Sequence, residues 1–247
     1  MSYLDKFTVQ TDVKENIQLV KGTRKSGNYT ETIKYENGIE CMLTYKNKIK
    51  IEEEWRLVDS KHPDSSIIPH RDNNDLPACI SYYDNGSNKK EEWWIKYNRH
   101  RDNDLPACID YYENGNKSYE GWFIKHEQNR HNLPACIEYH RNGNKKKEEW
   151  KLGDEYYRSN DLPSYIEYYE NGNKKEERWL VEEEYYKKSD STGCGIYHRN
   201  NDLPACIQYY ENGSKKQEEW FIKGHSSRNN NLRFRPFKIY RLYNCSN

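Results

Sequence analysis

Hydrophobic and polar positions alternate in short runs along most of this chain, and one run returns at regular intervals. In residues 105–122, LPACIDYYENGNKSYEGW, apolar side chains recur at every second position, which is the period of a β-strand. They are Ala107, Ile109 and Tyr111. Asn114-Gly115 follows, and Asn-Gly is the strongest short-range signal for a hairpin turn. The stretch predicts two antiparallel strands joined by a tight turn, with a proline starting the first strand.

The same unit occurs five times, with a constant interval from its proline to its Asn-Gly pair and to its tryptophan. The copies are residues 76–93, 105–122, 133–150, 162–179 and 203–220. A decayed copy, residues 38–55, has Ile39 in place of the proline and Lys48 in place of the turn glycine. Because Gly tolerates positive φ and Lys does not, this copy predicts a strained or differently shaped turn. Before it, Tyr35–Gly38 repeats the turn signature and suggests a first, incomplete hairpin.

The turn type decides which side chains share a face of the sheet. If Asn114-Gly115 forms a two-residue type I′ turn, Ile109 pairs with Glu120. Trp122 then lies on the face of Ile109, and Cys108 lies on the other.

A three-residue turn with a glycine bulge is the alternative. It would pair Ile109 with Tyr119 and move Trp122 to the face of Cys108. We favour the two-residue turn because it places the large ring of Trp122 opposite Ala107, a position that is Ala in four copies and Ser in the fifth.

The repeats organise the chain as an all-β fold, an elongated single-layer antiparallel β-meander of tandem hairpins of 28 or 29 residues each. Residues 1–30 are expected to be an N-terminal cap or arm, and residues 31–225 the repeat region. Residues 182–195 are an insertion, because the prolines around them are 41 residues apart. Residues 226–247 predict a capping half-repeat whose arginines discourage further strand addition.

Five of the seven cysteines fall at one repeat position. They are Cys41, Cys79, Cys108, Cys136 and Cys206. Equivalent residues two strands apart are separated by about 9.6 Å, which exceeds the ~7 Å limit for a disulfide. Metal clusters use shorter spacings, and Tyr165 replaces one cysteine, so we expect a ladder of small apolar side chains and no metal site. Cys194 and Cys245 lie off this ladder.

The composition narrows the functional classes. A chain with 34% hydrophobic and 32% charged residues resembles disordered segments, but 23 tyrosines supply large amphipathic side chains. Forty basic and forty acidic residues cancel, which disfavours nucleic-acid binding. No apolar run fits a signal peptide or a transmembrane segment. We expect a protein that is not secreted and lies in the cytoplasm, or in the host cytoplasm or virion if viral.

No motif predicts catalysis or a cofactor, so we expect no enzyme. Paired glutamates precede the tryptophan in three copies, as Glu91-Glu92, Glu148-Glu149 and Glu218-Glu219. The two members of a pair point to opposite faces, and we expect solvated charges facing lysines. His-Arg pairs before the Asp-Leu-Pro step could form a cationic row for phosphate or carboxylate groups. We favour a structural role in which each arginine pairs with a nearby aspartate, as Arg101 could with Asp104, while the histidine packs on an aromatic ring.

Aromatic ladders are the candidate binding surface. The tryptophans are Trp93, Trp122, Trp150, Trp179 and Trp220, and the tyrosines are Tyr82, Tyr111, Tyr139, Tyr168 and Tyr209. Such ladders usually hold strands together. If one face remains open, the row could bind a peptide, another copy of the chain or a sugar polymer.

The units HRDNDLPACIDYYENGNKSYEGWFI and HRNNDLPACIQYYENGSKKQEEWFI, residues 100–124 and 198–222, resemble the MORN-repeat-variant proteins of bacteria and large DNA viruses, including giant viruses. The resemblance implies tandem hairpins and roles in protein contacts, dimerisation or membrane apposition. We therefore expect a non-enzymatic repeat scaffold that binds a protein partner or itself. The alternatives are a glycan-binding repeat module and a peripheral membrane or phospholipid-binding protein.

Overall fold

The computed structural model describes residues 18–21, 28–35, 38–58, 67–71, 76–95, 98–124, 127–130, 132–153, 155–181, 196–223 and 225–226. Within these ranges one sheet contains fifteen strands. Fourteen lie side by side in chain order: β1 (Gln18–Lys21), β2 (Asn28–Lys34), β3 (Ile39–Lys46), β4 (Ile49–Val58), β6 (Cys79–Tyr82), β7 (Asn88–Glu92), β10 (Cys108–Tyr111), β11 (Lys117–Gly121), β14 (Cys136–Tyr139), β15 (Lys145–Glu149), β18 (Tyr165–Tyr168), β19 (Lys174–Arg178), β22 (Cys206–Tyr209) and β23 (Lys215–Glu219). The fifteenth, β5 (Ile67–Pro69), pairs with β4 beside this path.

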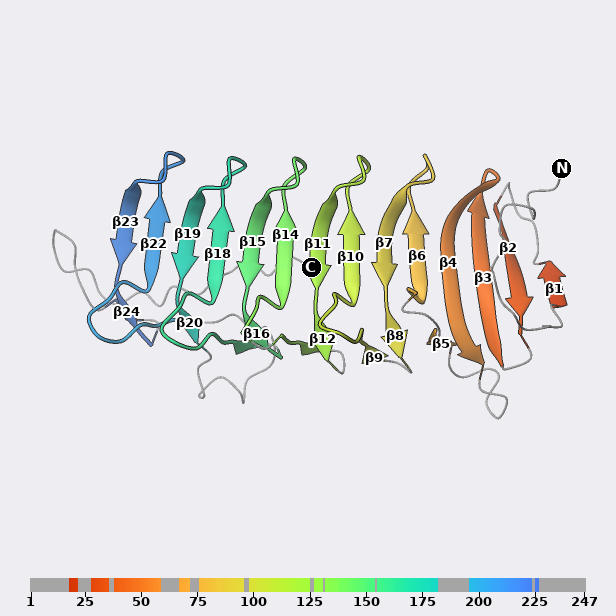
Figure 1. Cartoon of the computed structure of the whole chain (residues 1–247), viewed down its shortest axis with the longest axis horizontal. Coiled ribbons are helices and arrows are strands. Elements are labelled where there is room, and N and C mark those ends of the chain that lie inside the picture. Colours follow the sequence, from red (N-terminus) through yellow and green to blue (C-terminus); the bar gives the residue numbers. More distant parts are fainter. Residues whose placement is uncertain are drawn as a thin grey trace.

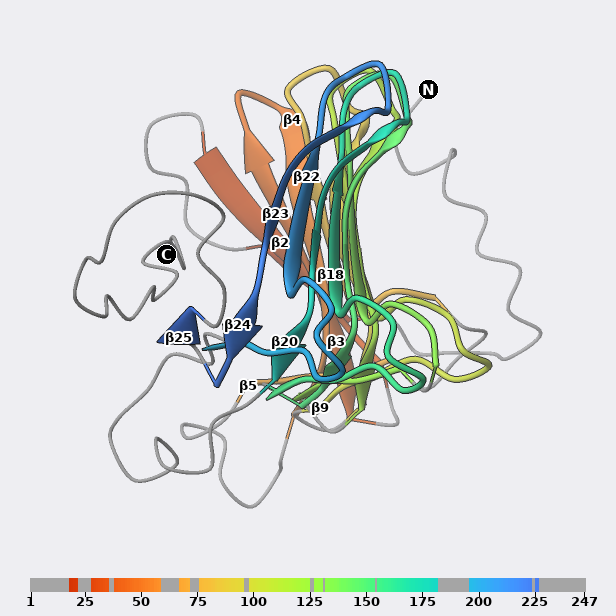
Figure 2. The ribbon, with the colours of Figure 1, turned by 90° about the vertical axis from the view of Figure 1, so that its left-hand side faces the viewer.

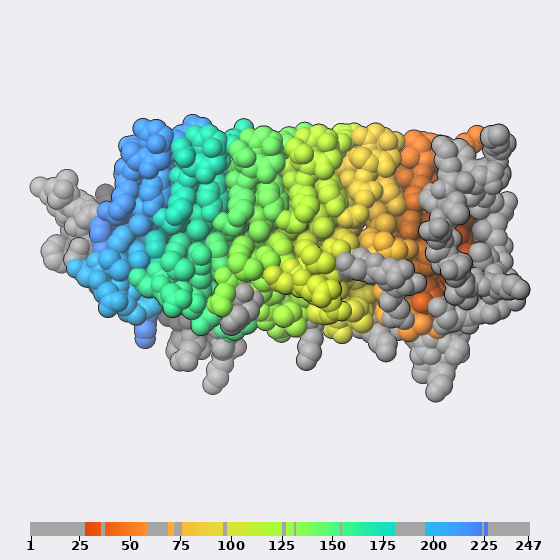
Figure 3. All heavy atoms as spheres, in the orientation of Figure 1, coloured from red at the N-terminus to blue at the C-terminus, as the bar shows by residue number. Residues whose placement is uncertain are grey.

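Every pair of neighbouring strands is antiparallel, so the sheet is an open, elongated meander, as the repeats predict. Figure 1 shows the strands in sequence order along the long axis, and Figure 3 shows the repeats as parallel ribs. Seen along the array in Figure 2, the later hairpins project onto one another, whereas β2 to β4 are tilted away from them.

A second row of very short hairpins follows the tryptophans. In the described part of the chain these pairs are β8 (Trp94–Ile95) with β9 (Asn98–Arg99), β12 (Phe123–Ile124) with β13 (Glu127–Gln128), β16 (Lys151–Leu152) with β17 (Glu155–Tyr156), β20 (Leu180–Val181) with β21 (Ile196–Tyr197), and β24 (Phe221–Ile222) with β25 (His225–Ser226). They lie at the end of the sheet opposite the Asn-Gly turns (Figure 1). Each repeat therefore has a long hairpin and a short one.

The Asn-Gly turn has three residues, so the prediction of a two-residue type I′ turn is wrong. The Tyr112 N–H donates to the Asn116 carbonyl at 2.8 Å, and the Gly115 N–H donates to the Tyr112 carbonyl at 2.9 Å. Gly115 has a φ of +87°, but Asn114 is not among the described residues with positive φ. This geometry is a type I turn followed by a glycine bulge.

The predicted pairing of Ile109 with Glu120 is nevertheless correct, because a second irregularity compensates for the longer turn. Tyr111 pairs with Lys117, and the register then shifts by one residue at Ser118. The same shift occurs in the other four full repeats. Trp122, two residues beyond Glu120, consequently lies on the face of Ile109, as predicted.

The decayed repeat has a different turn, as Lys48 predicts. Lys46 pairs with Ile49, and the two residues between them have φ values of +53° and +68°. This is the two-residue turn expected of the full repeats. A register shift after it brings Cys41 opposite Trp55, whereas Cys108 is opposite Gly121.

The five-cysteine ladder is therefore wrong at one position. Paired residues project to the same face, so Cys41 lies on the tryptophan face. The other four cysteines continue one row on the opposite face through direct pairing with Glu92, Gly121, Glu149 and their equivalents. All five are free thiols. Burial raises the pKa of Cys41, Cys79 and Cys108 to about 12, which keeps these thiols protonated.

At the N-terminal end, β2 and β3 form a hairpin paired over seven residues, longer than the incomplete one suggested by sequence. The Tyr35 N–H donates to the Ile39 carbonyl at 2.9 Å, and Gly38 has a φ of +80°. The expectations for residues 1–17, for the insertion and for residues 227–247 lie outside the described residues. In the described part, no helix has the length and hydropathy of a membrane span.

Candidate binding surface

The tryptophan row is a core rather than an open face. Four of its members are buried: Trp93, Trp122, Trp150 and Trp179, with 5–8% of each exposed. An arginine from the following repeat lies over each ring, with its guanidinium carbon 3.6–4.0 Å from the ring centre. Trp93 also packs against Ala107 and Ile109 of the next hairpin. Each of these four tryptophans therefore joins two repeats.

The arginines that cover the tryptophans also pair with aspartates, but not as predicted. Asp104 is held by Arg130 of the next repeat, with two hydrogen bonds of 2.8 and 2.7 Å, and not by Arg101. Arg101 instead lies over Trp93. The hydrogen bond from Arg130 lowers the pKa of Asp104. The constant interval of eight residues from Trp93 to Arg101 and from Trp122 to Arg130 was a visible signal for this stacking.

The tyrosine row binds glutamates that are buried or half-buried. Tyr111 donates to Glu91 of the preceding repeat at 2.7 Å, and Tyr139 and Tyr168 donate to Glu120 and Glu148 in the same way. The remaining members, Tyr82 and Tyr209, donate to Glu53 and Glu177. Burial and the glutamate bond raise the pKa of Tyr111. These hydroxyls therefore form hydrogen bonds between neighbouring repeats.

The glutamates are not the solvated charges that the sequence suggested. Glu120 and Glu148 are 7% and 6% exposed, and each forms an ion pair with the lysine three residues earlier. On a regular strand residues i and i+3 face opposite ways, but the register shift at Ser118 brings Lys117 and Glu120 together. Buried carboxylates need such partners. The register shift therefore creates a Lys-Glu-Tyr contact across two repeats.

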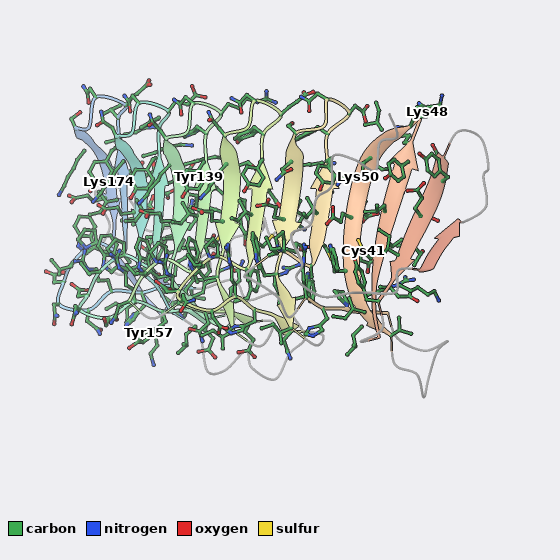
Figure 4. All side chains as sticks on the ribbon, turned by 45° about the vertical axis from the view of Figure 1, so that its right-hand side comes forward. Cys41, Lys48, Lys50, Tyr139, Tyr157 and Lys174 are labelled. Atoms are coloured by element: carbon green, nitrogen blue, oxygen red, sulfur yellow. The ribbon has the colours of Figure 1, made fainter. Side chains whose placement is uncertain are left out.

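A second tyrosine in each unit ties neighbouring hairpins together at the turn. Tyr83 donates to the Tyr111 carbonyl and Tyr112 to the Tyr139 carbonyl, both at 2.7 Å. Tyr169 does the same with the Tyr209 carbonyl. In Figure 4, Tyr139 lies on the sheet below the turn end, which Lys48 marks, and Tyr157 lies toward the opposite end.

The exposed apolar residues belong to two other rows. The leucine row precedes the prolines and consists of Leu76, Leu105, Leu133, Leu162 and Leu203, each 37–46% exposed. A turn projects Leu105 outward: its N–H donates to the Asp102 carbonyl at 3.3 Å, and Asn103 and Asp104 between them have φ values of +60° and +55°. Asn and Asp tolerate this backbone better than most residues.

The isoleucine row lies on the first strands of the short hairpins. Its described members are Ile95, Ile124, Leu152 and Ile222, each 39–50% exposed. Side chains alternate along the two-residue strands, so Phe123 and Phe221 turn toward the sheet and the next residue turns outward. Each row therefore presents one aliphatic side chain per repeat, at intervals of about 9.6 Å from two strand spacings.

Polar and acidic groups border both rows. Asp102 is highly exposed beside the leucine row, and the paired Asp104 is 54% exposed. In the isoleucine row, Ile124 is paired across its hairpin with Glu127, and Leu152 with Glu155. Each row is a narrow apolar line with carboxylates beside it.

Sequence reasoning missed these rows although their signal was present. A leucine precedes the proline in all five full copies, and an aliphatic residue follows the tryptophan at the second position. No family model, curated protein or solved structure matches the chain. The resemblance to MORN-repeat-variant proteins therefore rests on the repeat motif and stays a prediction.

Proposed function

We propose that this protein is a non-enzymatic repeat scaffold that binds a protein partner, or a second copy of itself, along its aliphatic rows. The observation that carries the proposal is the regular exposure of leucine and isoleucine while Trp93, Trp122, Trp150 and Trp179 are buried. Scattered exposed aliphatics are ordinary, but exposed apolar residues gathered in one region mark interaction sites. Here the exposure follows the repeat.

The contacts between repeats suit a scaffold. Each hairpin is joined to the next by strand pairing, by an arginine over a tryptophan and by a tyrosine bound to a glutamate. These contacts fix the spacing of the aliphatic side chains, so a partner meets a preorganised line and loses less entropy on binding.

The glycan alternative has less support. Sugar-binding sites stack exposed aromatic rings on the sugar, and here the arginines lie over the tryptophans. A membrane-binding role draws some support from the exposed aliphatics. The carboxylates of Asp102 and Asp104 beside the leucine row oppose contact with an anionic lipid surface, so we favour a protein partner.

A triple leucine variant tests the proposal: Leu105→Gln, Leu133→Gln and Leu162→Gln. Its control is Glu113→Gln, Arg141→Gln and Glu211→Gln, three exposed positions at the turn end. Light scattering over a concentration series measures self-association, and quantitative affinity capture from the native source measures other partners. We expect the leucine variant alone to lose binding. The proposal would be contradicted if the unmodified protein stayed monomeric and captured no partner, or if both variants bound equally.

The alternatives are tested with the unmodified protein. Flotation with vesicles containing anionic lipids measures membrane binding, and a glycan array measures sugar binding. Vesicle binding that is abolished in the triple leucine variant would replace the protein partner with a lipid surface.

A further inference from the structure

The five Asn-Gly turns of the full repeats belong to two chemical classes. In three of them asparagine directly follows the Asn-Gly pair, as Asn116, Asn144 and Asn173. In the other two, which are the first and the last of the full repeats, serine follows it, as Ser87 and Ser214. The backbone is alike in all five, since each glycine has a φ between +84° and +89°.

In the asparagine class, the side-chain amide of the asparagine in the Asn-Gly pair donates a hydrogen bond to the next turn. The Asn114 Nδ2 donates to the Arg141 carbonyl at 3.1 Å, and the Asn142 Nδ2 donates to the Glu170 carbonyl at 2.9 Å. The Asn171 Nδ2 makes the same bond to the next turn at 3.0 Å. The Oδ1 atom of each receives one turn hydrogen bond, from the backbone N–H two residues later.

In the serine class, the amide oxygen receives two donors. The Ser87 N–H and Oγ–H both donate to the Asn85 Oδ1, at 2.9 and 2.7 Å. Ser214 donates twice to the Asn212 Oδ1, at 3.0 and 2.7 Å. Among the described residues, neither Nδ2 is tied to a neighbouring turn as in the other class.

We propose that Asn85 and Asn212 are the preferred sites of spontaneous deamidation in this protein. The deprotonated backbone nitrogen of the following glycine attacks the asparagine Cγ and forms an N–Cγ bond. The Cγ–Nδ2 bond then breaks, and ammonia leaves with a proton from the solvent. Water opens the resulting succinimide to aspartate or isoaspartate. No oxidant or reductant is needed, and each event adds one carboxylate.

The two hydrogen bonds favour this reaction because negative charge develops on Oδ1 during the attack. Donors already aimed at that oxygen stabilise the transition state, as in an oxyanion hole. In the other class one donor is missing, and the departing amide is held by the next turn. The glycine N–H is hydrogen-bonded to a carbonyl in all five turns, at 2.8–2.9 Å, so this restraint does not distinguish them.

Peptide mapping by mass spectrometry tests the proposal. The full chain is incubated in mildly alkaline buffer, and the deamidation rate of each turn asparagine is divided by its rate in the urea-unfolded chain. This ratio removes the intrinsic effect of serine or asparagine on the local sequence. We expect ratios about fivefold higher at Asn85 and Asn212 than at Asn114, Asn142 and Asn171, which corresponds to about 1 kcal/mol.

Two variants separate the causes. Ser87→Ala and Ser214→Ala remove the hydroxyl donor and should slow deamidation at the preceding asparagine. Asn144→Ser places that donor in a central turn and should accelerate deamidation at Asn142. Equal ratios at all five turns, or faster reaction at the tied asparagines, would overturn the proposal. So would a folded Asn144→Ser variant with an unchanged rate at Asn142.

Discussion

The decayed repeat and the full repeats differ in the length of their turn, yet both place the tryptophan on the same face of the sheet. In the decayed copy a two-residue turn is followed by a register shift that brings Cys41 opposite Trp55. In the copy at residues 105–122 a three-residue turn is followed by a similar shift, and Cys108 is opposite Gly121. The tryptophan keeps its face in both, but the cysteine changes sides. Turn length and register shift therefore have to be known together before a side chain can be assigned to a face.

The difference extends to the residue before the tryptophan. Burial alone would raise the pKa of Glu149, but Lys151 and Lys147 lower it overall, and Lys151 lies 3.1 Å away. At the equivalent position, burial raises the pKa of Glu54, and its neighbour Glu52 adds to the rise. The same residue type is stabilised as an ion in one repeat and disfavoured as an ion in the other.

The largest expected effect compares two tryptophans. Trp150→Ala should lower the free energy of unfolding by about 3–5 kcal/mol, because the ring is 5% exposed and packed in the middle of the array. Trp55→Ala should cost less, because the ring is only half-buried and lies nearer one end, where a repeat can unfold locally. Urea unfolding followed by circular dichroism measures both. Equal losses would contradict a linear array.

The second expectation concerns pH. Because the folded pKa of Glu149 is lowered, its contribution is present above the ordinary value of 4.5 and is lost as pH falls through the folded value. Glu149→Gln should therefore destabilise the protein by about 1–3 kcal/mol at pH 7 and by less near pH 3.

Glu54→Gln is the matched comparison. Its folded pKa is raised, so the stabilising form is the protonated one, fully present below 4.5 and lost as pH rises through the folded value. The variant should be neutral or stabilising at pH 7. Unfolding curves at several pH values test both changes, and parallel pH profiles for the two variants would disprove the contrast.

The third expectation isolates the turn glycine. Gly115→Ala should destabilise the hairpin by about 1–2 kcal/mol, because an L-residue is strained at a φ of +87°. A Cβ at this position would meet no atom within 4 Å, so the cost is conformational and not steric. Glu113→Ala, at an exposed position of the same turn, is the control. An equal effect at both positions would argue against the positive-φ explanation.

The sequence predicted the repeat unit and the antiparallel meander, because a period of two and a constant spacing determine them. The predicted pairing of Ile109 with Glu120 is also correct, but only because the register shift at Ser118 compensates for a turn one residue longer than predicted. The sequence did not predict the turn length, because Asn-Gly suits both turn types. It did not predict that Glu120 binds Lys117 and Tyr139, because these contacts depend on a register shift that has no recognisable residue pattern. Exposure of the leucine row follows from a turn with two positive φ values, which required the backbone to be known.

The smallest expected effect returns to the decayed turn. Lys48 has a φ of +68° and is exposed, so Lys48→Gly removes backbone strain without removing a buried contact. We expect a gain in unfolding free energy of up to about 1 kcal/mol, reduced by the greater freedom of glycine in the unfolded chain. Lys48→Ala keeps the strain and should give no gain. Urea unfolding followed by circular dichroism measures the parent and both variants. An equal gain in Lys48→Ala would contradict the strain explanation, because alanine is no better suited than lysine to a φ of +68°.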